Sequence, residues 1–389
     1  MSQSDKEHFE SYKPQTLAKH TILKNYIAVY FHILKRGEDR IFYIDGFAGR
    51  GTYTGDDGSP IPGSPRHALE LIASNTELAE KVQTIFIERD KELFSQLKET
   101  LRSFHAEHPD VRDPHLENGT FSSKMTEILD SWKKRNIATA PMFVFVDPCG
   151  VDGVDFAVIQ RLLSIQRKNE IFLFFNVDGI RRILGLRDSM GDTLARLLGT
   201  EDRAAALVRV VDSVRTTSER EEAIIRYYED LLRANTSGKY VASFRVEKED
   251  RRTTSHYLIH VAQHHRGFSI MKDVMWSVGR TSEGKGGLLF EQASYSRTEA
   301  LFRPGWDSVK TSILEELRAG PKCVAYFYGE LVERPENRLC AAAYRNALLE
   351  LETEGKILVL NPDGRTPAPK RRTHKGSPTL GERYYVKAR

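Results

Sequence analysis

The side chains best suited to hold a ligand follow directly after apolar stretches of the sequence. Asp45 ends the first such stretch, and the loop after it has glycine at positions 46, 49 and 51. Three later stretches end in Glu88, Asp147 and Asn176. Carboxylates accept hydrogen bonds, and glycine lets a ligand approach the backbone because it has no Cβ and tolerates positive φ. These residue types predict a site for a nucleotide-like ligand.

The stretches that lead to these residues are typical of buried strands. They lie within residues 40–53, 82–90, 142–150 and 170–176, and a weaker strand is expected at 115–119. Central parallel strands are buried on both faces and therefore read as continuous apolar runs. Helical spacing of apolar residues appears at 16–35, from about Pro65 and at 91–104. This alternation predicts an α/β fold with a doubly wound sheet, in which ligands lie beyond the carboxyl ends of the strands.

The following segments predict how the sheet is completed. Residues 180–234 are helical and heavily charged, and residues 239–247 and 256–263 predict two strands joined by a polar turn. Such a hairpin would close one side of the parallel sheet. A helix is expected at 267–279 and a flexible break at 281–287.

Residues 306–389 read as a separate module. Three helical segments precede a strand at 357–360 and a final strand near the C-terminus. This order resembles a winged helix-turn-helix whose wing is the loop 361–382, and a basic tail on a helical bundle is the alternative. We therefore expect two domains, at 1–290 and 300–389.

Composition limits the class of protein. The chain has 389 residues, of which 40% are hydrophobic and 29% are charged, and no apolar run approaches the ~20 residues that span a bilayer. The first 15 residues are polar and lack the apolar core of a secretory signal. The three cysteines show neither disulfide nor metal spacing. These features predict a cytoplasmic protein with no membrane role.

Positive charge gathers at one end of the chain. The net charge is only +4, but basic residues outnumber acidic ones strongly in the last 25 residues, where Glu382 is the one acidic residue. Such a cluster favours contact with a phosphate backbone. We expect nucleic acid, either DNA or RNA, to bind at Arg365, Lys370, Arg371, Arg372 and Lys375.

The glycine loop resembles a cofactor-binding motif. The order D-G-F-A-G-R-G from Asp45 is similar to the D-x-F-A-G-x-G loop of S-adenosylmethionine (SAM) dependent methyltransferases, particularly those that act on nucleic-acid bases. The resemblance implies that SAM is the cofactor and that its amino-acid end contacts Asp45, Gly46, Phe47, Gly49 and Gly51. Glu88 would accept hydrogen bonds from the ribose, unless it only begins a helix. Glu117, Asn118 or Gly119 would lie near the adenine.

The turn at 147–150 determines the expected chemistry. In base-amino methyltransferases the corresponding turn is Asp/Asn/Ser-Pro-Pro-aromatic: its oxygens accept hydrogen bonds from the target amino group, and its aromatic ring stacks on the flipped base. Here Asp147 and Pro148 match, whereas Cys149 and Gly150 replace the second proline and the aromatic residue. We predict catalytic roles for Asp147 and Pro148. Cys149 stands one position too early for the nucleophile of cytosine-C5 methyltransferases, so a small half-buried thiol is the more common interpretation.

Together these motifs resemble the three-Cys-motif partner protein (TcmP) family. The resemblance rests on K-x-x-I-L-x-x-Y at 19–26, Y-I-D-G-F-A-G-x-G-x-Y at 43–53 with Gly-Ser-Pro at 63–65, V-D-P-x-G at 146–150, and M-K-x-x-M-W at 271–276. It implies a class I methyltransferase-like, Rossmann-like fold and a partner enzyme of the radical type, and the family usually has Phe at the position of Cys149. We expect a SAM-dependent methyltransferase that acts on a base amino group. The alternatives are a catalytically inactive nucleic-acid-binding or sensor protein of the same fold, and a nuclease that uses Asp45, Glu88 and Asp147 around a metal.

Overall fold

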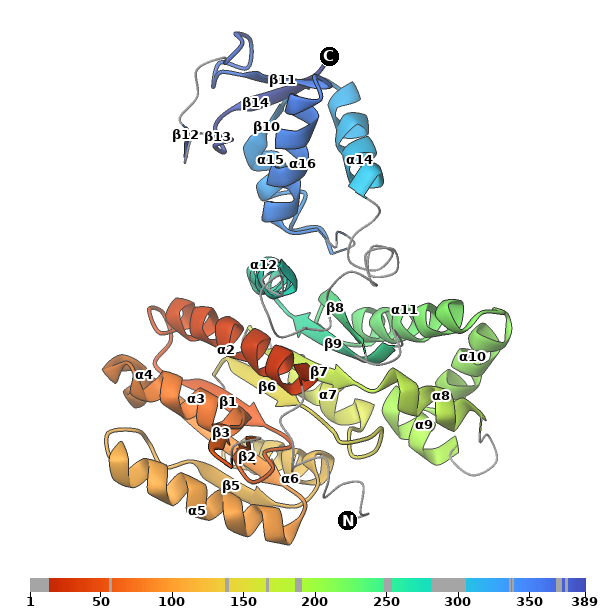
Figure 1. Ribbon diagram of the computed structural model, residues 1–389. Coiled ribbons are helices and arrows are strands. Elements are labelled where there is room, and N and C mark those ends of the chain that lie inside the picture. The colour runs from red at the N-terminus through yellow and green to blue at the C-terminus, as the bar shows by residue number, and fades with distance from the viewer. Residues whose placement is uncertain are drawn as a thin grey trace.

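The computed structural model of the chain describes residues 14–55, 58–136, 140–165, 168–185, 191–247, 254–280, 306–335, 337, 339–368, 373–374 and 377–389. Figure 1 shows a large α/β unit with a smaller unit of helices and short strands next to α12. Within the described ranges, no helix combines the length and the apolar character that a membrane crossing needs.

A seven-stranded sheet forms the centre of the α/β unit. Its order is β5-β4-β1-β6-β7-β9-β8, with parallel pairing from β5 to β7 and antiparallel pairing of β9 with both β7 and β8. The strands are β1 (Ile41–Asp45), β4 (Val82–Glu88), β5 (His115–Asn118), β6 (Met142–Val146), β7 (Glu170–Phe175), β8 (Tyr240–Glu247) and β9 (Thr254–Ala262). The prediction of a mainly parallel sheet closed by a hairpin is therefore confirmed.

The strand order reverses at β1. The chain adds β4 and β5 on one side of β1 and then returns to add β6 and β7 on its other side. Adjacent loops after β1 and β6 therefore leave the sheet toward different helices. In open α/β sheets, this switch point is where the crevice for a ligand opens.

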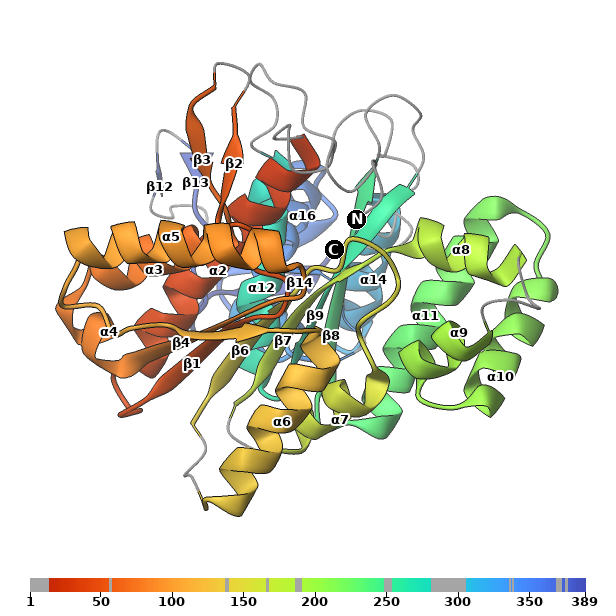
Figure 2. The same ribbon diagram turned by 90° about the horizontal axis from the view of Figure 1, so that it is seen from below.

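Helices cover both faces of the sheet, as Figure 2 shows. On one face lie α2 (Pro14–Leu34), α3 (Ser64–Ala73), α4 (Thr76–Lys81), α5 (Lys91–Glu107) and α12 (His265–Arg280). On the other lie α6 (Phe121–Lys134), α7 (Phe156–Ser164), α8 (Val177–Gly185), α9 (Gly191–Leu198), α10 (Glu201–Asp212) and α11 (Thr217–Asn235).

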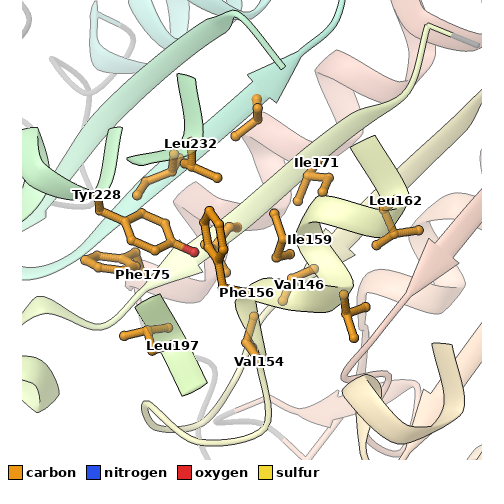
Figure 3. Packing of buried hydrophobic residues seen from close by; sticks show 14 of the residues in the cluster. Val146, Val154, Phe156, Ile159, Leu162, Ile171, Phe175, Leu197, Tyr228 and Leu232 are labelled. Atoms are coloured by element: carbon orange, nitrogen blue, oxygen red, sulfur yellow. The ribbon is translucent and has the colours of Figure 1, made fainter. Parts of the chain in front are cut away.

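Alternate residues of each central strand enter different cores. In β6, Phe143 and Phe145 pack toward α2, whereas Val144 packs toward α6 and α7. Successive side chains of a strand point to opposite faces, so both cores need apolar residues and the strand has no polar face. Figure 3 shows part of the core between the sheet and the helices α6 to α11, in which the rings of Phe175 and Tyr228 stack with their centroids 4.5 Å apart.

The segment between Asp45 and α3 contains a hairpin. The sequence predicts turns around its Gly-Ser-Pro repeats, but β2 (Thr52–Thr54) and β3 (Pro60–Pro62) pair antiparallel there. These strands belong to a small sheet of their own, so a proline removes no hydrogen bond from the central sheet. Gly63 follows β3 and donates a hydrogen bond to the carbonyl of Gly51 at 2.9 Å. A Cβ on Gly63 would lie 2.9 Å from that oxygen, so glycine is required.

Residues 306–389 contain a third core. It includes apolar residues of α14 (Trp306–Arg318), α15 (Val324–Tyr328) and α16 (Ala341–Thr353). A three-stranded sheet of order β10-β14-β11 completes it, formed by β10 (Lys322–Cys323), β14 (Tyr385–Ala388) and β11 (Ile357–Leu360). Two further short strands, β12 (Thr373–His374) and β13 (Ser377–Pro378), pair with each other.

One buried lysine joins this unit to α12. The ammonium group of Lys272 donates hydrogen bonds to the carbonyls of Val332 at 2.7 Å and Asn337 at 2.8 Å. Burial lowers the pKa of Lys272 to about 7. The predicted break at 281–287 lies outside the described residues.

Candidate functional site

A pocket opens at the switch point of the sheet. It encloses about 770 Å³ of space, part of it open to solvent. Its walls come from the glycine loop at 47–53, from Gly63 and Ser64, from the turn at 147–149, from two residues of α2, and from one residue each of β7 and β9. The pocket thus joins the loops after β1 and β6, although Asp45 and Asp147 are 102 positions apart in the sequence.

Positive backbone angles shape the glycine loop. Gly49 has φ +60° and Gly51 has φ +81°, conformations that other residues adopt only with strain. Four consecutive backbone N–H groups of the loop are already held: Gly46 donates to Phe145 O and Ala48 to Ile87 O, both at 2.9 Å, Phe47 donates to Asp45 Oδ1 at 3.2 Å, and Gly49 donates to Glu88 Oε2 at 2.8 Å. The loop therefore has a fixed shape before any ligand arrives.

Asp45 lies fully buried beneath this loop. Its Oδ1 accepts a hydrogen bond from the backbone N–H of Phe47 at 3.2 Å. Burial raises the pKa of Asp45 to about 7, although hydrogen bonds from the Ser64 side chain and from Phe47 oppose the shift. The side chain can therefore exist with or without its proton near neutral pH.

Glu88 and Asn118 brace the loop from the neighbouring strands. The two carboxylate oxygens of Glu88 accept hydrogen bonds from Gly49 N at 2.8 Å and Asp90 N at 2.7 Å. Burial raises the pKa of Glu88, although these backbone donors oppose the shift. Asn118 donates to the carbonyl of Glu88 at 2.8 Å. Neither side chain is among those that line the pocket. A carboxylate oxygen has a second lone pair, so these contacts leave the predicted ribose contact of Glu88 open.

The pocket contains an ion pair that the sequence analysis did not predict. Lys19 of α2 forms this ion pair with Asp147. The side chains are only 8% and 17% exposed. Burial lowers the pKa of Lys19, but the charge of Asp147 leads the opposing influences and the net pKa is raised. The signal for this contact was a lysine among the apolar positions of the helix, four residues before Leu23 and seven before Tyr26.

An aromatic pair forms the wall beyond Asp147. The rings of Phe174 and His256 lie with centroids 4.1 Å apart and planes 32° from parallel. The ammonium of Lys19 lies 5.0 Å from the centroid of Phe174. Cys149 is exposed at the same turn, and none of the three cysteines forms a disulfide. Sequence reasoning did not identify Phe174 or His256 as pocket residues.

Two histidines lie behind the glycine loop. The ring of His20 is 5.6 Å from that of Tyr53 and 5.2 Å from that of His67. Burial lowers the pKa of both histidines. Burial also raises the pKa of Tyr53 to about 12, although Lys19 opposes this shift. At neutral pH these three rings are uncharged, so the charged side chains that line the pocket are Lys19, Arg50 and Asp147.

The carboxylates of Asp45, Glu88 and Asp147 do not make a metal cluster. In the part of the chain that the structure describes, no group of three or more His, Cys, Asp or Glu side chains is arranged to hold a metal ion. The nuclease alternative needed these carboxylates within one coordination sphere. The geometry instead gives a shaped backbone loop next to a hydrogen-bond acceptor, Asp147, and an aromatic wall.

Of the predicted nucleic-acid-binding residues, the structure describes Arg365, which is not among the residues that line the pocket. Arg365 is exposed in a turn where Asp363 accepts its backbone N–H at 2.8 Å. Lys370, Arg371, Arg372 and Lys375 lie outside the described residues.

Comparison with known proteins gives distant likenesses in fold. No protein-family model and no curated protein matches the chain. Among solved structures, the protein LPL1258 from Legionella pneumophila str. Philadelphia 1, of family-model DUF519, is 12% identical with a TM-score of 0.42, covering 69% of this chain and 91% of that one. An O-methyltransferase from Bacillus cereus in complex with SAH is 13% identical with a TM-score of 0.31, covering 62% and 80%. The plantazolicin methyltransferase BamL, in complex with a triazolic desmethylPZN analog and SAH, is 10% identical with a TM-score of 0.31, covering 63% and 85%. At these values the site itself must carry the functional conclusion.

Proposed function

We propose that this protein binds SAM in the pocket at the switch point and transfers its methyl group to an amino group of a nucleic-acid base. The observation that carries the proposal is the shared pocket of the glycine loop after β1 and the Asp147-Pro148 turn after β6. Doubly wound sheets bind nucleotide-like ligands at this place. A methyl donor and an acceptor group would meet there.

The glycine loop fits the cofactor. Gly49 and Gly51 have positive φ and line the pocket, so a ligand can approach their backbone without meeting a Cβ. We infer that the loop backbone and Asp45 hold the amino-acid end of SAM, that Glu88 accepts from the ribose, and that Asn118 lies toward the adenine. An ionised Asp45 would pair with the cationic amino group of the cofactor.

Asp147 and Pro148 fit the acceptor. SAM bound here would supply an electrophilic methyl group, with S-adenosylhomocysteine as the leaving group. The carboxylate of Asp147 and the carbonyl of Pro148 would accept hydrogen bonds from the base amino group and direct its nitrogen lone pair toward the methyl carbon. Lys19 pairs with Asp147 and holds its carboxylate in place. The amino group loses one proton, which the Asp147 carboxylate takes and passes to solvent.

The C-terminal unit fits a role in holding the nucleic acid. The helices α14, α15 and α16 and the strand β11 precede the basic loop, and β14 follows it and pairs with β11. This order supports a winged helix-turn-helix. We propose domains at 1–290 and 300–389, with Arg365 and its four basic neighbours on the phosphate backbone. The motifs shared with the TcmP family extend the proposal to a cytoplasmic protein that works with a three-Cys-motif enzyme of the radical type.

Calorimetric titration of SAM and S-adenosylhomocysteine tests the cofactor claim. One equivalent should bind to the wild type, and Asp45→Asn should weaken binding by at least about tenfold, because a charge-assisted hydrogen bond is worth roughly 1.5–3 kcal/mol. Asp130→Asn is the matched control, since Asp130 is an exposed carboxylate on α6 that pairs with Arg161. No binding at millimolar SAM would refute the proposal. Transfer of labelled methyl groups to DNA and RNA pools then tests the reaction.

A second candidate is a sensor that binds the same ligands without catalysis. It is favoured by Gly150, which stands where base-amino methyltransferases carry a stacking ring. Saturable binding of S-adenosylhomocysteine and of nucleic acid, with no labelled methyl in any pool, would support the sensor over the enzyme.

A further inference from the structure

The aromatic pair of Phe174 and His256 has no part in the mechanism above. Phe174 is near the carboxyl end of β7, and His256 is near the start of β9. β9 runs antiparallel to β7, with Phe174 opposite Leu258 and Phe175 opposite Tyr257. His256 therefore lies at the edge of the sheet where β1 and β6 also end.

The order of the strands gives the pocket two halves. The glycine loop follows β1, the Asp147 turn follows β6, and the two rings come from β7 and β9, which is also the order of these strands in the sheet. Asp147 thus separates the cofactor loop from the aromatic pair. Lys19 links the centre to the far half, since it pairs with Asp147 and lies 5.0 Å from the centroid of Phe174.

Space is left at the position of the missing ring. A Cβ built on Gly150 would meet no atom within 4 Å. The turn therefore carries no aromatic side chain at this position, and no neighbouring atom takes the place of its first side-chain carbon. His256 is half-buried and Phe174 is 7% exposed, so the pair offers the surface of His256 with Phe174 as its support.

We infer that Phe174 and His256 form the stacking surface for the acceptor base, in place of a ring at position 150. This rests on the proposed function and names its substrate class: a planar heterocycle with an exocyclic amino group, such as adenine or cytosine, in an unpaired or flipped nucleotide. The base stacks on His256 with its amino edge toward Asp147. Stacking on a π face accepts either base, so the amino group at Asp147 selects among bases.

Nucleotide titration tests this surface. Adenosine 5′-monophosphate and cytidine 5′-monophosphate are titrated into protein saturated with S-adenosylhomocysteine, with ribose 5-phosphate as the probe that lacks a base. The nucleotides should bind and ribose 5-phosphate should bind at least about tenfold more weakly, since stacking supplies much of the affinity. His256→Ala should weaken nucleotide binding by about fivefold or more, and His256→Phe should retain it within about twofold.

His264→Ala is the matched control, because His264 is an exposed histidine outside this pocket and its ring stacks on that of His265. All variants should bind S-adenosylhomocysteine as the wild type does, which also reports that they are folded. If His256→Ala does not fold, quenching of 2-aminopurine riboside 5′-monophosphate on the wild type replaces it, since a stacked fluorophore is dimmed.

The outcomes separate this inference from the proposed function. Equal nucleotide affinity in wild type and His256→Ala, equal binding of ribose 5-phosphate and nucleotides, or an unquenched bound fluorophore would each overturn the stacking surface. Failure of the wild type to bind S-adenosylhomocysteine would instead overturn the proposed function. The nucleotide titrations are then repeated without it, and the same comparisons decide the inference.

Discussion

Asp45 gives the stability of the α/β unit a distinctive dependence on pH. Burial raises the pKa of Asp45 from its ordinary value of 3.8 to about 7. Between these values the folded protein keeps a proton that the unfolded chain has released. Folding takes up one proton in this window, so the free energy of unfolding falls as pH rises from about 4 to about 7 and then levels off.

The size of the effect follows from the two pKa values. Between about pH 5 and about pH 8, the linkage relation gives a loss of roughly 2–3 kcal/mol for one such group. Asp45→Asn keeps the shape of the side chain but cannot titrate, so its stability should lack this contribution. Urea unfolding of both proteins across this range measures the difference. His20 and His67, whose pKa values burial lowers, titrate in both proteins and cancel.

Cofactor binding should show the opposite trend. The cationic amino group of SAM favours ionised Asp45, so the affinity of the wild type should rise with pH through about 7, and that of Asp45→Asn should change little. Asp130→Asn should follow the wild type in both assays. Identical stability profiles for wild type and Asp45→Asn would refute the assignment of the buried proton to Asp45.

Three further predictions concern other parts of the molecule. Lys19→Met should cost about 3 kcal/mol in urea unfolding, because it leaves the largely buried Asp147 carboxylate without its cation, and adding Asp147→Asn should restore part of the loss; no recovery would argue against the pair. Gly51→Ala should cost about 1–2 kcal/mol of thermal stability because φ is +81° there, whereas Gly37→Ala, with open space around its Cβ, should not. Under the proposed function, replacing Lys370, Arg371, Arg372 and Lys375 by serine should lower the salt slope of DNA binding by about 0.9 per lost phosphate contact, and an unchanged slope would place the contact elsewhere. Substitution is preferable to truncation, since β14 is the central strand of its sheet.

The sequence predicted those parts of the fold that repeat a simple pattern. Four apolar runs became β1, β4, β6 and β7, and the polar residues after them stand at one edge because parallel strands share a direction. The hairpin of β2 and β3 escaped prediction, since strands of three residues are too short for alternation to be visible. Its Gly-Ser-Pro repeats resemble plain turns.

The part of the candidate site that a single loop forms could be predicted from the sequence. The contacts between segments that are distant in the sequence could not. Lys19 and Asp147 are 128 residues apart, and neither segment reveals its partner. Phe174 belongs to a continuous apolar run, in which a ring that faces the pocket cannot be told from one in the core. Glu88 stands at the predicted strand end, but its nearest contacts are backbone N–H groups of Gly49 and Asp90.

The clamp between Lys272 and the carbonyls of Val332 and Asn337 has a consequence for target choice. Lys272 lies on α12, which follows β9, the strand that carries His256. Rotation of the C-terminal unit would remove both acceptors from a buried amine, so these contacts oppose rotation of that unit against α12. Under the proposed function, a nucleic acid held by this unit would then approach the pocket in a preferred orientation, so the position of a base along the strand would influence its selection in addition to its chemistry.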